Sequence, residues 1–203
     1  MAISTILDSL YQGLLATTWV EFVAVIFGLL SVWFSRNENI LTYPTGIINV
    51  LIYIYLCFTA GLYADMGINA FYFVMSVYGW YNWSRRDMNS KHVPITKLSA
   101  WGWTYNIILV FGFFGLLWFV LARYTPSTVP MFDSFTTALF IVGMWLMARK
   151  KVENWLAWIA GDILVIPLFA YKGLVFTGFQ YMVFTALAIS GYIEWRKKLK
   201  SGQ

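Results

Sequence analysis

The sequence predicts an all-α polytopic membrane protein: seven transmembrane helices, arranged as two parallel three-helix repeats on either side of a linker helix. Three observations predict it. Of the 203 residues, 60% are hydrophobic and only 11% are charged, whereas soluble domains carry about 25% charged residues. Seven stretches are long and apolar enough to cross a bilayer. A shift of 112 residues aligns the first three stretches with the last three.

The spans are defined by length and hydropathy. A helix needs about 20 mostly apolar residues to cross roughly 30 Å of hydrocarbon. The stretches that meet this requirement are 17–35, 43–60, 63–83, 100–122, 131–149, 152–171 and 174–195. Before them, residues 2–11 have apolar side chains at helical spacing, which predicts an amphipathic helix at the membrane interface. The first sixteen residues contain no Lys or Arg and do not resemble a signal peptide.

The basic residues predict the orientation. If the N-terminus lies outside, all of the 14 Lys and Arg residues except Arg123 and Lys172 fall on the cytoplasmic side. The positive-inside rule therefore predicts an outer N-terminus and a cytoplasmic C-terminus. This distribution accounts for the net charge of +5, and we expect no nucleic-acid partner.

The internal repeat aligns residues 33–83 with 145–195 without a gap. Trp33 falls on Trp145, and the Gly79–Trp83 pattern falls on residues 191–195. We expect a single domain over 1–203, with repeat one at about 17–83, a linker helix at about 100–122 and repeat two at about 131–195. Shared hydropathy is the alternative explanation. Parallel repeats are one of the known transporter plans, with the substrate site at the repeat interface near the membrane midplane.

The sixth span carries the strongest candidate site. Trp155, Trp158 and Asp162 are spaced i, i+3, i+7 and so share one helical face. Asp162 lies about ten residues into the span, roughly 15 Å deep. A carboxylate beside two indoles suits a flat organic cation, since each indole face attracts a cation by about 0.5–2 kcal/mol. The alternatives are a tryptophan belt at the interface and an aspartate satisfied by neighbouring polar groups.

Other spans offer polar faces at similar depth. An Asn in a membrane helix is often an interhelical hydrogen-bond donor, and for Asn49 we weigh that role equally with ligand contact. For the polar faces of the other spans we favour packing within the helix bundle over ligand contact. The additional candidate substrate-binding residues are Asn49, Tyr53, Asn69, Tyr72 and Gln180.

Several functions are disfavoured. The chain has one Cys and one His, so we expect no disulfide, no metal site and no cofactor. We expect no enzymatic activity, because no span carries paired carboxylates. Aromatic residues followed by arginines at 78–86 are typical of an anchoring belt at the cytoplasmic interface, which predicts an interfacial Trp83.

These residues resemble the PnuC family of vitamin transporters over nearly the whole chain. The resemblance is carried by residues 43–50, 61–65 and 78–83, and most specifically by 153–162. It implies the full-length SWEET-like fold and facilitated diffusion of a vitamin across the bacterial inner membrane. It also implies trapping by a cytoplasmic vitamin kinase, and a homotrimer in which each protomer has its own pathway.

Asp162 marks a departure within the family. Nicotinamide riboside carriers tend to have Trp-x-x-Trp-x-x-x-Asn here, and the aspartate resembles the thiamine-transporting PnuT branch. The resemblance therefore favours thiamine, with nicotinamide riboside as the alternative; both are flat cationic heteroaromatic vitamins. A membrane channel or assembly protein is the alternative from another class.

Overall fold

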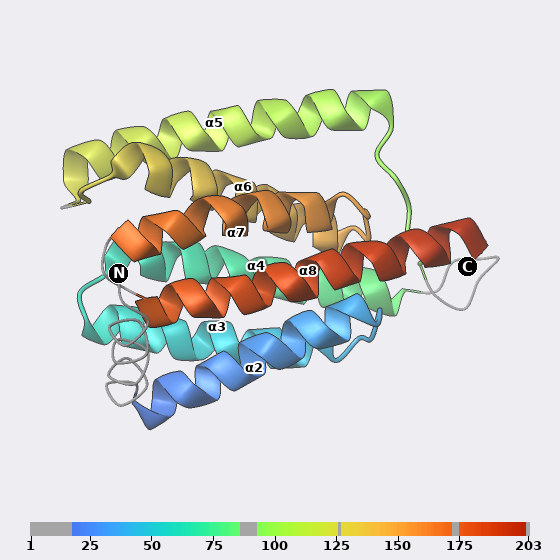
Figure 1. The fold of residues 1–203 in the computed structure, drawn as a ribbon, viewed down its shortest axis with the longest axis horizontal. Helices are drawn as coiled ribbons and strands as arrows, with labels where there is room; N and C mark the ends of the chain where they lie inside the picture. The colour runs from blue at the N-terminus through green and yellow to red at the C-terminus, as the bar shows by residue number, and fades with distance from the viewer. Residues whose placement is uncertain (1–17, 86–92, 126, 172–174, 202–203) are drawn as a thin grey trace, which may run out of the picture.

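All seven predicted spans are helices. A computed structural model describes residues 18–85, 93–125, 127–171 and 175–201 (Figure 1). The predicted leader helix at 2–11 lies outside them. The helices are α2 (Trp19–Arg36), α3 (Thr42–Thr59), α4 (Tyr63–Ser84), α5 (Ala100–Tyr124), α6 (Pro130–Ala148), α7 (Asn154–Tyr171) and α8 (Val175–Ser201). The predicted bounds agree within a few residues, except that α8 continues six residues beyond the predicted end.

Six of these helices form a closed ring. Each packs against the next in the order α2, α3, α4, α6, α7 and α8, and α8 packs against α2. Helix α5 lies outside the ring and packs against α6, as its separate position in Figure 1 shows. The two three-helix units therefore meet along two seams, between α2 and α8 and between α4 and α6. This arrangement leaves an enclosed interior between the units.

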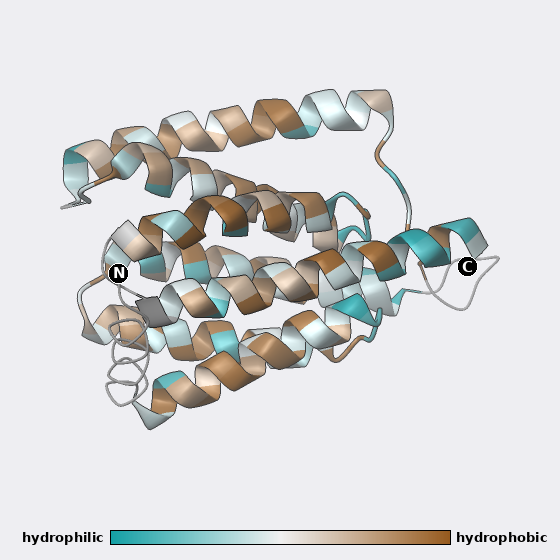
Figure 2. Ribbon diagram, viewed as in Figure 1, coloured by the Kyte–Doolittle hydropathy of each residue, from teal (hydrophilic) through white to brown (hydrophobic). Residues whose placement is uncertain are grey.

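The helices differ in how apolar they are. Among the described residues, α2, α3, α5 and α6 are long and apolar enough to span a membrane by composition alone. Helix α4 has 22 residues, about 33 Å at 1.5 Å per residue, but its inner face is more polar. Figure 2 shows hydrophilic residues gathered at the end of the bundle that carries the C-terminus. This is the end where the basic residues cluster, and we call it the basic end.

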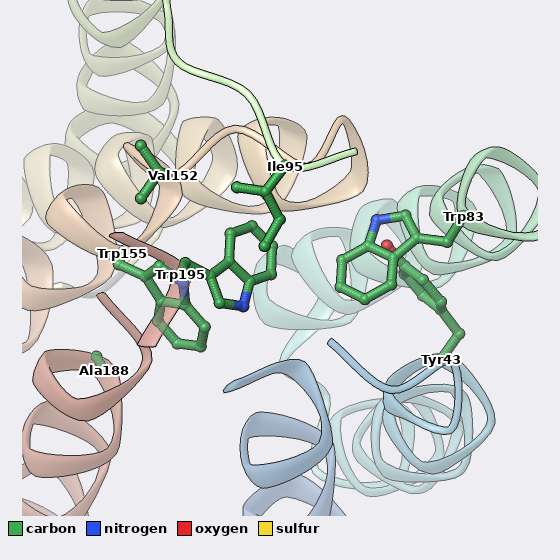
Figure 3. Close-up of a cluster of buried hydrophobic side chains, with 7 residues drawn as sticks. All are labelled: Tyr43, Trp83, Ile95, Val152, Trp155, Ala188 and Trp195. Carbon is green, nitrogen blue, oxygen red and sulfur yellow. The ribbon is translucent and has the colours of Figure 1, made fainter. Parts of the chain in front are cut away.

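An aromatic core fills the basic end of the ring (Figure 3). Our prediction of an interfacial Trp83 is wrong: its side chain is 2% exposed and its indole Nε1 donates to the Met147 carbonyl at 3.1 Å. Trp83 lies one turn from Gly79 on the face of α4 that points into the ring, where burial outweighs an interfacial position. Trp80 and Tyr81 are exposed, as an anchoring belt requires.

The internal repeat remains a prediction, and one pair of contacts supports it. The Trp83 indole donates to the Met147 carbonyl, and the Trp195 indole donates to the Ser35 carbonyl at 2.9 Å. Each residue in the second bond lies 112 positions from its counterpart in the first. The same bond therefore crosses each seam once, as a rotation relating the two units would require.

Candidate functional site

A cavity of about 920 Å³ occupies the interior of the ring. At one end its wall includes exposed residues of the α3–α4 turn and Tyr124 at the end of α5; at the other it stops at buried Tyr43 and Trp155. It therefore opens away from the basic end. The structure brings all eight predicted substrate-binding residues to this wall: Asn49, Tyr53, Asn69, Tyr72, Trp155, Trp158, Asp162 and Gln180.

Asp162 and Trp158 lie one helical turn apart on α7. Asp162 is 4% exposed, and within the described residues it makes no hydrogen bond or ion pair. Trp158 packs against α6 at Gly143, where an added Cβ would lie 3.3 Å from the indole. Burying a carboxylate without a compensating partner is expensive. A cation in the cavity would supply that partner.

A stack of aromatic rings extends from Trp158 along the cavity wall. The Trp158 and Phe140 rings lie 5.4 Å apart at an interplanar angle of 24°, and Phe140 and Tyr181 lie 6.3 Å apart at 20°. Phe169 continues the stack, 5.3 Å from Tyr181 at 24°. Gly161 makes the stack possible, because any side chain there would overlap the Phe140 ring. The wall therefore carries a continuous row of aromatic rings contributed by α6, α7 and α8.

Sequence reasoning missed Phe140 and Phe169. Phe140 shares a helical face with Asp133 and Thr136, at i, i+3, i+7 spacing, and all three line the cavity. A polar pattern therefore marks this face. Tyr181 stands on a polar face of the last span, beside Gln180, but its place in an aromatic stack depends on contacts between three helices. A second local signal is the glycine preceding Asp162, which indicates close approach of another side chain.

Two amides at the wall donate to backbone carbonyls, one between helices and one within a helix. The Asn49 amide Nδ2 donates to the Ala24 carbonyl on α2 at 2.7 Å, the interhelical bond expected for an Asn in a membrane. The Asn69 Nδ2 donates to the Asp65 carbonyl one turn back at 2.9 Å. Each amide retains an oxygen acceptor, so both the structural and the ligand-contact interpretations remain compatible with the geometry.

Trp155 is placed differently from its partners on α7. It is 2% exposed, packs on Gly191, and meets the Trp195 ring edge to face at 5.6 Å. The polar end of its indole has no hydrogen-bond partner within the described residues. Trp155 therefore lies at the closed end of the cavity, in the aromatic core, whereas Trp158 and Asp162 lie along the wall.

The charged side chains described on the cavity wall are all acidic. Three aspartates line the cavity, Asp65, Asp133 and Asp162, and no Lys, Arg or His stands among the described lining residues. No group of three or more His, Cys, Asp or Glu in the described part of the chain could hold a metal ion. The arrangement suits an organic cation with a flat ring.

Known proteins resemble this chain over most of its length. Residues 18–197 match the family model described as nicotinamide mononucleotide transporter. The chain is 31% identical to the nicotinamide riboside transporter PnuC of Escherichia coli K12, over 88% of this chain and 85% of that protein. It is 27% identical to the riboflavin/roseoflavin transporter RibM of Streptomyces davaonensis, over 87% and 84%. The crystal structure of the vitamin B3 transporter PnuC superposes with a TM-score of 0.74 at 25% identity, covering 98% of this chain and 91% of that one.

Proposed function

Because the chain belongs to the nicotinamide mononucleotide transporter (PnuC) family, we propose that it carries a flat, permanently cationic heteroaromatic vitamin across the bacterial inner membrane. One observation carries the proposal: the cavity wall combines Asp162 with a stack of aromatic rings and has no basic side chain among the described residues. A positive ring there would pair with the carboxylate and lie against the indole face.

Two vitamins fit this description. Nicotinamide riboside is the substrate named for the E. coli relative, and its pyridinium ring is a permanent cation. Thiamine carries a thiazolium ring, and Asp162 in place of the Asn typical of nicotinamide riboside carriers favours it. Riboflavin, named for a more distant relative, is neutral and would leave Asp162 unpaired.

The orientation, the transport mode and the assembly are parts of the same proposal, supported by the positive-inside rule and by the family resemblance. From the distribution of basic residues we infer a cytoplasmic C-terminus, and the cavity described here would then open to the outside. Facilitated diffusion would deliver the vitamin inward, and phosphorylation by a cytoplasmic kinase would trap it there. We propose a homotrimer in which each protomer contains its own cavity.

Counterflow in liposomes tests the function. Purified protein is reconstituted, the vesicles are loaded with unlabelled thiamine or nicotinamide riboside, and the labelled vitamin is added outside. A carrier gives saturable uptake with a transient accumulation above equilibrium. Linear, unsaturable uptake would instead support a channel, and no uptake of any vitamin would contradict transport.

Competition tests the role of charge. Dihydronicotinamide riboside matches nicotinamide riboside in size but carries no charge, so the pair isolates the positive ring. We expect the charged form to compete at least about tenfold better, as a charge-assisted contact implies. Equal competition by the neutral form, or preference for riboflavin, would contradict a site built for a cation.

A further inference from the structure

The closed end of the cavity is blocked by more than aromatic packing. A strap of residues 93–98 leads toward α5 and lies against the α6–α7 turn. Its Thr96 amide donates to the Lys150 carbonyl, and its Thr96 carbonyl accepts from the Val152 amide, both at 3.0 Å. Ile95 on this strap is 3% exposed and inserts into the aromatic core near Trp195 (Figure 3). The strap therefore plugs the basic end.

Lys150 joins the strap to both three-helix units. Its ammonium donates to Glu38 Oε1 at 2.8 Å, in the α2–α3 turn, and to the Val93 carbonyl of the strap, also at 2.8 Å. It also lies 4.7 Å from the centre of the Trp83 ring on α4. The residue is only 2% exposed. A buried ammonium persists where its partners are well placed, and here they come from separate segments.

Glu38 receives a second ammonium. Lys198 on α8 donates to Glu38 Oε2 at 3.0 Å and to the Asn37 carbonyl at 3.3 Å. Burial alone would raise the pKa of Glu38, but the hydrogen bonds and charges of Lys150 and Lys198 together lower it below its usual value. The carboxylate therefore stays ionised at neutral pH and holds both lysines.

We propose that Glu38, Lys150 and Lys198 form a latch that keeps the cytoplasmic end of the transport cavity closed and must open for the vitamin to leave. This rests on the transport function and orientation proposed above. The ring can open at this end only if the α2–α3 turn moves away from the α6–α7 turn. That movement breaks the Glu38–Lys150 contact. The latch therefore stabilises the closed state relative to the open state.

Thiol labelling at the two ends of the cavity tests the latch without any substrate. With the native thiol removed by Cys57→Ser, Ser35→Cys reports on the closed end, where Ser35 is buried and lines the cavity. In a separate variant, Ala64→Cys reports on the open end. A membrane-impermeant maleimide is applied from each side of oriented vesicles, and labelling rates are compared before and after Glu38→Gln or Lys150→Met.

The expected result is reciprocal. Each latch variant should raise cytoplasmic labelling of Ser35→Cys by roughly tenfold, the effect of losing one charge-assisted contact, and should lower external labelling of Ala64→Cys. Glu194→Gln and Lys197→Met are the matched controls, because they remove the charges of a 4.0 Å ion pair on α8 outside the latch and should change neither rate.

Each other outcome is decisive. Unchanged labelling of Ser35→Cys in Glu38→Gln would overturn the latch, as would faster labelling at both ends, which indicates loosened structure. Glu38→Gln preserves the side-chain volume and decides the matter if Lys150→Met does not fold. If the protein without any of these substitutions shows no counterflow, the transport function itself is refuted. Labelling of Ala64→Cys from the cytoplasmic side would refute the orientation.

Discussion

Replacing Asp162 by Asn should weaken binding of the cationic vitamin by about ten- to a hundredfold. Asn keeps the size and shape of the side chain and removes only its charge. Asp162 is 4% exposed and lacks a hydrogen-bond or ion-pair partner in the described residues, so little water or protein screens its attraction for a ligand cation. A charge-assisted contact is worth about 1.5–3 kcal/mol, which corresponds to that range in Kd.

Two comparisons separate charge from shape. Trp158→Phe keeps a ring against Phe140 and should weaken binding by less than about fivefold, because only part of a cation–π term is lost. Dihydronicotinamide riboside should bind the wild type and Asp162→Asn within about threefold of each other, since it carries no charge for the carboxylate to attract. Isothermal titration calorimetry on the purified proteins measures each Kd.

Thermal unfolding supplies the folding control. An unpaired buried carboxylate is costly, so Asp162→Asn without ligand should unfold at the same temperature as the wild type or higher. The increase in Tm that saturating vitamin gives should shrink. An unchanged Kd for the charged vitamin would refute the reasoning, and so would an equal loss of affinity for the charged and neutral ligands. Asp162 would then be a packing residue.

Three further predictions concern the orientation, the packing and the pH dependence. A reporter fused to the C-terminus should be active only in the cytoplasm, and periplasmic activity would reverse the orientation of every residue discussed. Gly79→Ala should lower Tm, because a methyl there overlaps the Tyr43 ring and overpacking costs about 1–3 kcal/mol; Gly67→Ala, a helical position with open space, is the matched control and should leave Tm unchanged or raise it. The folded pKa of Glu38 lies below its usual 4.5, so the carboxylate's contribution is fully present above about pH 4.5 and is lost as the pH falls through the lowered value. The difference in Tm between the wild type and Glu38→Gln should therefore be constant from pH 7 to pH 5 and disappear in stronger acid.

The sequence could predict what depends on local pattern. Span length, hydropathy and the i, i+3, i+7 spacing on α7 are properties of single segments, and the structure has the helices where they were predicted. Asp162 was identifiable because an ionisable group inside a span is rare and therefore informative.

The sequence could not predict what depends on contacts between segments. Trp83 followed by arginines has the same local pattern whether it anchors at an interface or packs inside the ring, and only the position of Met147 across the seam distinguishes the two. Lys150 belongs to a run of three basic residues, which normally indicates a solvated turn. Its burial depends on Glu38 and on the strap that Ile95 anchors, both distant in the chain.

Close packing at the basic end repeats at the same interval of 112 residues. The Tyr43 ring lies against Gly79, and the Trp155 ring lies against Gly191, so each unit seats one aromatic ring on a glycine of its own third helix. These rings form the closed end of the cavity. Because each unit contributes one, the latch proposal predicts that the two units move relative to each other when this end opens.

Glu38 and Lys150 extend this argument from packing to charge. They are the non-glycine residues with positive φ in the described chain, at 60° and 52°, and they stand 112 positions apart. This backbone conformation costs roughly 1–2 kcal/mol in residues other than glycine, so both turns keep the same unfavourable geometry. In the proposed repeat the two residues are equivalent, and they touch each other at 2.8 Å. Equivalent residues can touch only where the axis that relates the two units passes between them. Two identical charged residues at that place would repel each other. With Glu at one position and Lys at the other, that contact is an attraction between the two units, at the place where the proposed latch would have to open.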